Sequence, residues 1–222
     1  MNQKYIRQNT HGLYYIPENQ LHRRAAQVVA EGNVWESETI DFIIENLNNK
    51  SAVTAGSYFG DFLPALSKET SQTIFTYEPV PEQFDYAKKT IELNNLKNVV
   101  IENLALSDKN GFVIMELCNP KSDEMLLLGG GSRIVSQQSK TTIEVRSTTL
   151  DSLIPNDCEI SVIHLDVEGH EGKALEGASR LIKKNLPIII VESFPEKFFQ
   201  TYLSPLGYTH QGIVARNHII RI

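Results

Sequence analysis

Cysteine, tryptophan and extended apolar stretches are all scarce in this sequence of 222 residues. Its two cysteines, Cys118 and Cys158, match no spacing of a metal-binding motif and are too few for a disulfide framework. No apolar stretch approaches the ~20 residues of a membrane-spanning helix. Residues 1–15 are polar and lack the apolar segment of a signal peptide. These absences predict a cytoplasmic protein with no membrane partner.

Basic residues are also too few for a surface that binds nucleic acid. The chain has 21 lysines and arginines against 27 aspartates and glutamates, which gives a net charge of −6. Broad electrostatic binding to phosphate backbones or to anionic lipids is therefore not expected. A hydrophobic content of 41% over this length suits one domain with a sizeable core. The sequence leaves the formation of a homo-oligomer open.

Residues 1–50 and residues 51–222 differ in their apolar patterns. Two stretches of helical spacing in the first part predict an N-terminal helical cap. From residue 51 onward, short apolar strands alternate with helical stretches, which predicts a mostly parallel sheet with right-handed crossovers. The expected strands of this core are 52–55, 73–77, 99–102, 160–165 and 188–191, and its expected helices are 61–68, 81–94, 173–184 and 197–203.

Two stretches depart from this alternation. Residues 112–149 predict an added antiparallel β ribbon, with strands at 112–117 and 141–146. Between these strands, residues 129–133 have the sequence Gly-Gly-Gly-Ser-Arg, which predicts an anion-binding loop or, in preference, a flexible tip. Residues 208–222 predict a closing hairpin. The expected fold is a single α/β domain whose mostly parallel sheet ends in an antiparallel strand.

The most informative run is Leu-Asp-Val-Glu-Gly-His-Glu at residues 165–171, directly after an expected strand. Ligands of an open α/β sheet bind outside the carboxyl ends of its strands, so this run places ionisable groups where chemistry would occur. His170 has a suitable ordinary pKa, about 6.5, for a general base. A solvent-facing residue at the start of a helix explains His170 equally well.

Carboxylates surround this histidine. Glu168 and Glu171 are candidates to orient His170, to bind substrate or to hold a cation. Asp166 and Glu192 end neighbouring expected strands, so we expect them to face the same crevice. Oxygen ligands of this kind suit a divalent metal, but nothing in the sequence requires one.

A glycine turn follows the first strand of the core. Residues 56–61, Gly-Ser-Tyr-Phe-Gly-Asp, would let the backbone approach a ligand closely. Glu78 ends the next strand, where an acidic side chain accepts hydrogen bonds from ribose hydroxyls. The segment after the third strand faces the base of such a ligand, although a plain turn also explains it. The candidate cofactor-binding residues are Gly56, Ser57, Gly60, Glu78, Asn103, Ala105 and Asp166.

These stretches together resemble the FkbM-type S-adenosylmethionine-dependent methyltransferases. The resemblance covers roughly residues 35–192 and implies a class I methyltransferase fold, a Rossmann-like sandwich with a seven-stranded sheet and an antiparallel final strand. It also implies S-adenosylmethionine as cofactor and O-methylation of a small-molecule or sugar hydroxyl, with His170, Asp166 and Glu168 as catalytic candidates. The matching stretches are 56–62, 77–82, 105–111, 149–153 and above all 165–178, which continues to Pro187 and Glu192.

Two positions depart from the family pattern. The family usually has an acidic residue where Thr54 stands and an Ala-Asn pair where Ser57 and Tyr58 stand. The acidic residue normally holds the amino group of the cofactor or orders the glycine loop, so a non-catalytic, methyltransferase-like binding protein is one alternative. A nicotinamide-dependent oxidoreductase is another, because Glu78 also suits the ribose of that cofactor, but the full GxGxxG fingerprint is missing.

Overall fold

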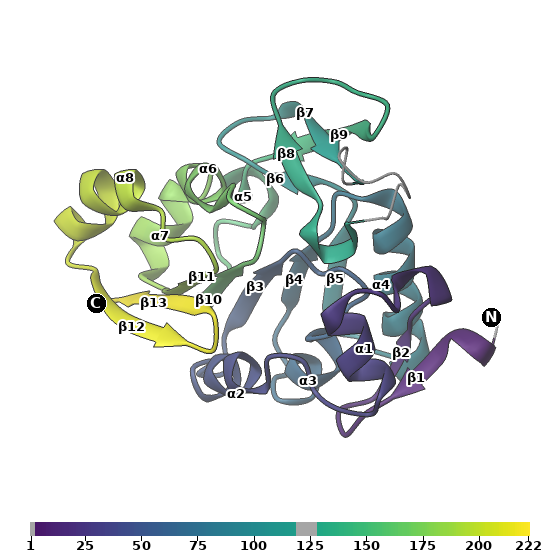
Figure 1. The fold of residues 1–222 in the computed structure, drawn as a ribbon. Coiled ribbons are helices and arrows are strands. Elements are labelled where there is room, and N and C mark those ends of the chain that lie inside the picture. The colour runs from purple at the N-terminus through teal and green to yellow at the C-terminus, as the bar shows by residue number, and fades with distance from the viewer. Residues whose placement is uncertain (1–2, 119–127) are drawn as a thin grey trace.

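A seven-stranded sheet forms the centre of the computed structural model, which describes residues 3–118 and 128–222 (Figure 1). The strand order is β12-β13-β11-β10-β3-β4-β5, and β13 is antiparallel to both of its neighbours while the other pairs are parallel. The predicted sheet with its antiparallel final strand is confirmed. The strands are β3 (Ser51–Ala55), β4 (Ile74–Tyr77), β5 (Val99–Glu102), β10 (Ile160–Leu165), β11 (Ile188–Val191), β12 (Thr209–Val214) and β13 (Asn217–Arg221).

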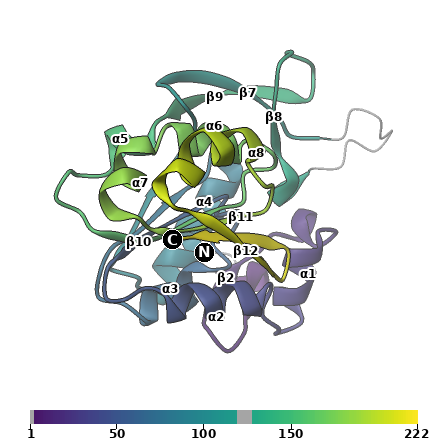
Figure 2. The same ribbon diagram turned by 90° about the vertical axis from the view of Figure 1, so that its left-hand side faces the viewer.

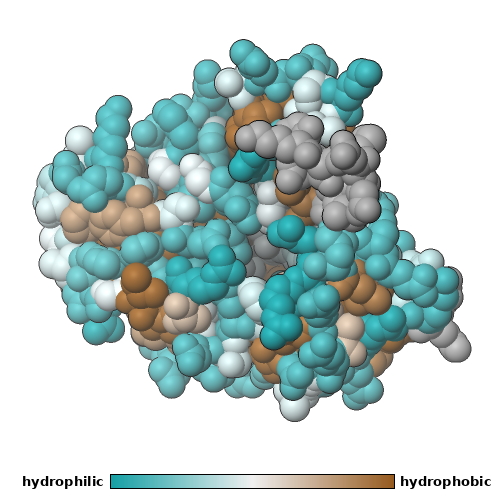
Figure 3. All heavy atoms as spheres, viewed as in Figure 1, coloured by the Kyte–Doolittle hydropathy of each residue, from teal (hydrophilic) through white to brown (hydrophobic). Residues whose placement is uncertain are grey.

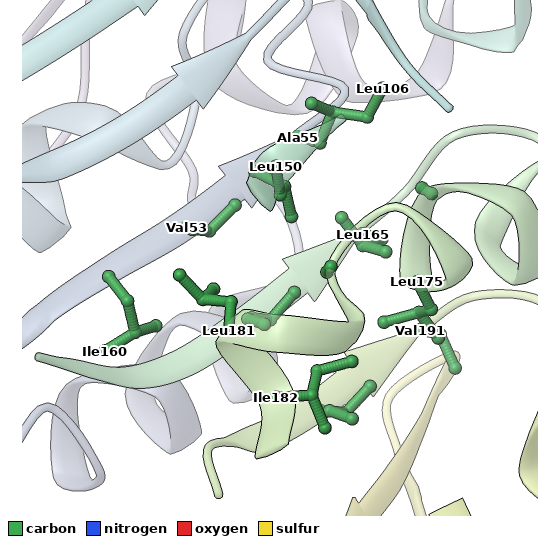
Figure 4. Packing of buried hydrophobic residues seen from close by; sticks show 14 of the residues in the cluster. Val53, Ala55, Leu106, Leu150, Ile160, Leu165, Leu175, Leu181, Ile182 and Val191 are labelled. Atoms are coloured by element: carbon green, nitrogen blue, oxygen red, sulfur yellow. The ribbon is translucent and has the colours of Figure 1, made fainter. Parts of the chain in front are cut away.

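Helices cover both faces of this sheet, so the central strands are buried on both sides (Figure 2). In β3, Ala52 belongs to the apolar cluster on one face, whereas Val53 and Ala55 belong to the cluster on the other face. Figure 4 shows this second cluster, where Leu181 and Ile182 pack onto the strands. The first face carries α2 (Ser37–Glu45), α3 (Leu63–Lys68) and α4 (Pro81–Asn94), and the second carries α5 (Leu150–Leu153), α6 (Glu171–Glu176), α7 (Ser179–Asn185) and α8 (Glu196–Phe198).

Several predicted helices have different boundaries in the structure. The single helix expected over 173–184 is divided into α6 and α7, because the chain passes very close to another segment at Gly177. A Cβ atom at Gly177 would lie 2.0 Å from the carbonyl oxygen of Ser107. The last expected helix consists of α8 followed by a π-helix, Phe199–Leu203.

The N-terminal segment contains the two predicted helices, α1 (Arg24–Ala30) and α2, and also a hairpin that was not predicted. The hairpin strands are β1 (Ile6–Gln8) and β2 (Leu13–Tyr15). β2 packs beside α4, where the amide nitrogen of Leu13 donates to Asn94 Oδ1 at 2.9 Å. The cap is therefore attached to the core through α4.

The inserted ribbon belongs to a second sheet of four strands, in the order β6-β9-β7-β8. Both predicted strands are present as β7 and β9, but the short β6 and β8 extend the ribbon on either side. Residues 119–127 of the predicted insertion lie outside the described part of the chain. The four strands are β6 (Ala105–Leu106), β7 (Gly111–Glu116), β8 (Arg133–Val135) and β9 (Thr142–Thr148).

The surface is mostly hydrophilic on the face seen in Figure 3, where the hydrophobic residues that are not drawn in grey form separate patches. Among the helices of the described residues, none is long and apolar enough to cross a membrane.

Candidate functional site

Three adjoining pockets lie at the carboxyl ends of β3, β4 and β10, and Gly56 and Asp166 line all three. The apolar pocket extends from β4 to the small sheet and is lined mainly by aliphatic side chains. The inner polar pocket lies on the α3 side of the sheet and contains Thr54, Asp61 and His164. The outer polar pocket contains charged side chains from distant parts of the chain: Arg23, Arg24, Glu36, Asp61, Glu168, Glu192 and Arg216.

Gly56 permits this arrangement because two backbone segments meet there. Its φ is +85°, and a Cβ atom would lie 1.9 Å from the carbonyl oxygen of Asp166. A side chain at this position would therefore push β3 away from the turn that follows β10. The glycine turn predicted from the sequence is thus a point of close backbone approach at the centre of the site.

Glu78 stabilises the same turn. Its carboxylate accepts hydrogen bonds from the backbone N–H groups of Tyr58, at 2.8 Å, and Val80, at 2.9 Å. Glu78 is only 3% exposed, and burial raises its pKa to about 7 although the two N–H groups act in the opposite direction. Each carboxylate oxygen has a second lone pair, so Glu78 can hold the turn and still accept a hydrogen bond from a ligand in the apolar pocket.

The other predicted cofactor residues occupy different places around the site. Ala105 lines the apolar pocket and Ser57 lines the inner polar pocket. The amide of Asn103 donates to the carbonyl oxygens of Glu78, at 2.7 Å, and Pro79, at 3.0 Å, so it supports the end of β4. Gly60, with φ +82°, forms the turn before α3. Contact of these residues with a cofactor stays a prediction.

The run at residues 165–171 folds around Glu171, which is 1% exposed. Glu171 Oε1 accepts the N–H groups of Val167 and Gly169, both at 3.3 Å. This carboxylate therefore holds the turn that carries Glu168 and His170, and it lines none of the three pockets. The structure thus gives Glu171 a role that was not among those expected from the sequence, the support of this turn.

His170 and Glu168 face different pockets. His170 lines the apolar pocket with its Nε2 3.0 Å from Ser107 Oγ, and burial lowers its pKa, so the ring is neutral at neutral pH. Glu168 lines the outer polar pocket, where burial and the charge of Glu192 raise its pKa while Arg23 acts in the opposite direction. The two candidate bases are thus separated by Asp166, which belongs to both pockets.

Asp166, Glu168 and Glu192 form an acidic cluster whose nearest oxygen atoms all lie within 4.8 Å of one another. Burial, and then the charges of Glu192 and Glu168, raise the pKa of Asp166 well above its usual value. Arg216 Nη2 lies 3.0 Å from Glu192 Oε1 and supplies a compensating positive charge. The predicted proximity of Asp166 and Glu192 agrees with this geometry.

The glycine-rich segment 129–131 packs onto the site, which corrects the preferred expectation of a flexible tip. Gly130 lies against the ring of Tyr58, and the Gly129 carbonyl accepts a hydrogen bond from Gln83 Nε2 at 2.8 Å. Arg133 does not assist an anion there, because it pairs with Glu116 at 2.8 Å. The segment thus covers the side of the apolar pocket next to the N-terminal cap.

Asp61 is a site residue that the sequence motifs did not single out. Burial raises its pKa to about 7, from an ordinary value of 3.8. The unfolded chain loses this proton at lower pH than the folded chain does. The folded state therefore binds more protons between these two values, and the free energy of unfolding falls as the pH rises through this range.

We expect the Asp61→Asn variant to be more stable than the parent protein at pH 8 by roughly 2 kcal/mol and to lose most of this advantage at pH 4. The measurement is urea unfolding of both proteins at a series of pH values. A difference between the two proteins that does not depend on pH would show that Asp61 ionises normally.

Comparison with known proteins identifies the domain. The family model described as the methyltransferase FkbM domain matches residues 55–215. The chain belongs to this family. The match includes the glycine turn, Glu78, the run at 165–171 and Glu192, and so confirms the family that the sequence resembles. The matched residues begin after the N-terminal cap, which contains Arg23, and after Thr54.

One solved structure shows the same fold at low sequence identity. Methyltransferase FkbM from Methylobacillus flagellatus KT is 14% identical with a TM-score of 0.51, and the match covers 78% of this chain and 44% of that protein. The chain therefore spans less than half of the length of the Methylobacillus protein. A SAM-dependent methyltransferase from Aquifex aeolicus is 12% identical over 92% of each chain, with a TM-score of 0.44. No curated protein matches the sequence.

Proposed function

We propose that this chain is an S-adenosylmethionine-dependent methyltransferase that modifies a hydroxyl group of a small molecule or sugar. The observation that carries the proposal is the set of three adjoining pockets, joined by Gly56 and Asp166, at the carboxyl edge of an FkbM domain. A cofactor that crosses Gly56 would have its nucleoside on one side and its amino acid portion on the other.

The apolar pocket suits the nucleoside. Leu104, Leu106 and Met115 provide apolar surface for an adenine ring, and Glu78 stands at the pocket wall where ribose hydroxyls would donate to it. His170 lines the same pocket, which places it beside the nucleoside in this arrangement. When bound, S-adenosylmethionine supplies the electrophilic methyl group.

The outer polar pocket suits the acceptor. Its acidic and basic side chains can accept and donate hydrogen bonds, as a molecule with several hydroxyl groups requires. Methyl transfer needs an acceptor held in line with the methyl group and a base for its proton. Glu168 faces this pocket and its pKa is raised, which makes it a stronger base than an ordinary carboxylate. We assign the base to Glu168, with Asp166 beside the reacting groups.

S-adenosylhomocysteine is expected to raise the melting temperature of this protein by about 5–10 °C when present at a hundred times its Kd. Binding to the folded state alone stabilises it by about 2.7 kcal/mol under that condition, and a domain of this size gains about 2–4 °C per kcal/mol. The measurement is thermal unfolding with the ligand, with NAD and with buffer.

The comparison between ligands separates the alternatives. A shift with NAD alone would favour an oxidoreductase, and no shift with millimolar S-adenosylhomocysteine would contradict the proposal. Binding without methyl transfer to any hydroxylated acceptor would favour a non-catalytic binding protein.

A further inference from the structure

The inner polar pocket contains a neutral pair of side chains. Thr54 and His164 are paired residues of β3 and β10, and Thr54 Oγ1 lies 3.0 Å from His164 Nδ1. The His164 ring is 4% exposed and stacks on Phe62, and burial lowers its pKa to about 4. His164 is therefore neutral, and this pair contributes no charge to the pocket.

Two carboxyl groups, Asp61 and Asp166, face the same pocket. Neither takes part in any of the ion pairs found among residues 3–118 and 128–222. Asp166 Oδ1 is buried without a hydrogen-bond partner in the described chain, and so is His164 Nε2. Buried carboxylates are costly unless they are paired, and unpartnered polar atoms need a ligand or water. The pocket thus suits a positively charged hydrogen-bond donor.

Asp61 also connects the two polar pockets. It lines the inner pocket beside His164 and the outer pocket beside Arg23, and both pockets meet the apolar pocket at Gly56. A nucleoside with its ribose at Glu78 would direct its 5′ substituent across Gly56 toward Asp61. The amino acid portion of the proposed cofactor carries an ammonium group, which matches the carboxylates, and a carboxylate, which matches the arginines of the outer pocket.

We propose that Asp61, together with Asp166, which lines the same pocket, binds the ammonium group of the cofactor. Thr54 on β3 carries no negative charge. The negative charge comes instead from Asp61, in the segment that leads into α3. This inference rests on the proposed function. It gives a reason for a half-buried carboxyl group whose raised pKa destabilises the folded chain at neutral pH: the group is kept for binding.

The test compares two nucleosides that differ in this ammonium group. S-adenosylhomocysteine carries the amino acid portion, and 5′-methylthioadenosine lacks it. In calorimetric titrations, Asp61→Asn should weaken binding of S-adenosylhomocysteine by about 10- to 100-fold, the range for a hydrogen bond to a charged group, and change binding of 5′-methylthioadenosine less than about threefold. Asp41→Asn, an equal charge change on the exposed side of α2, should affect neither ligand.

The pH dependence provides a second readout. Asp61 must lose its proton to bind an ammonium group, so S-adenosylhomocysteine affinity should rise between pH 6 and pH 8 about tenfold more than the affinity for 5′-methylthioadenosine, and Asp61→Asn should remove this difference. Ionisation of Glu78, whose pKa is also about 7, acts through the ribose and therefore affects both nucleosides alike. The other titratable or charged groups that face Asp61 or share its pockets are Tyr14, Arg23, Arg24, Glu36, Tyr58, Glu78, His164, Asp166, Glu168, Glu192 and Arg216, and the variant separates Asp61 from them.

The outcomes distinguish the two proposals. If the parent protein binds neither nucleoside, the proposed function fails and the inference fails with it. If both bind and Asp61→Asn weakens neither, or weakens both equally, only the role of Asp61 is overturned. Unfolding of Asp61→Asn would weaken the binding of both nucleosides and so would not produce the selective loss expected here. The variant should unfold at the same temperature as the parent protein or higher, and it should still bind 5′-methylthioadenosine.

Discussion

Replacement of Glu168 by glutamine should lower the rate of methyl transfer by about 10²–10⁴-fold, the usual contribution of a general base. Glu168 faces the outer polar pocket, and its raised pKa suits proton removal from a hydroxyl group. Glutamine keeps the size of the side chain and cannot accept the proton. Because Glu168 lines the outer polar pocket and not the apolar pocket, binding of 5′-methylthioadenosine, which lacks the amino acid portion, should change by less than about threefold.

The matched variant is His170→Ala, which removes the other candidate base from the apolar pocket. The measurement is the transfer rate to an acceptor found by screening sugars and small alcohols for the mass gain of one methyl group. In the parent protein the rate should rise with pH through a pKa above the usual value for glutamate. A large loss of rate in His170→Ala with a normal rate in Glu168→Gln would reassign the base to His170.

Replacement of Gly56 by alanine should lower the free energy of unfolding by about 3–5 kcal/mol, with a drop in melting temperature of about 10 °C. Two effects add. The positive φ of Gly56 is strained for alanine, and the new Cβ would overlap the carbonyl oxygen of Asp166, which is backbone and cannot rotate away. Since both residues line every one of the three pockets, S-adenosylhomocysteine binding should be lost as well.

Gly207→Ala is the control for this variant. Gly207 also has a positive φ, +95°, but nothing among the described residues lies within 4 Å of the position that a Cβ atom would take there. Gly207→Ala should therefore lower the free energy of unfolding only by the conformational cost of the positive φ, about 1–2 kcal/mol. Equal losses in the two variants, measured by urea unfolding, would show that the close approach of Gly56 to Asp166 has no energetic importance.

The fold could be predicted from the sequence because its signals are local. Strands such as Ile188–Val191 are continuous apolar segments, and the helices between them have apolar residues at helical spacing. The failures have a tertiary cause. The division of the helix at Gly177 depends on the carbonyl of Ser107, and the glycine is its one trace in the segment. β2 is held by side chains of α4, which are distant in the sequence.

The candidate site was predictable only in part for the same reason. Gly56, Glu78 and Asp166 each follow a strand of the sheet, and the carboxyl ends of parallel strands meet at one edge, so their proximity follows from the pattern. Arg23 comes from the N-terminal cap and Gly130 from the inserted ribbon. Arg23 and Gly130 lie at the site only because those two segments pack onto the sheet there.

The sequence by itself determined the class of fold, the edge of the sheet that carries the candidate site, and the family of the domain, because strand positions and strand ends follow from apolar periodicity and the family follows from short motifs. Only the tertiary structure decided what each polar group does there. It assigned Glu171 to the support of a turn, placed His170 and Glu168 in different pockets, and enclosed Asp61 enough to raise its pKa. Burial and hydrogen bonding set these roles, and both depend on residues that are distant in the chain.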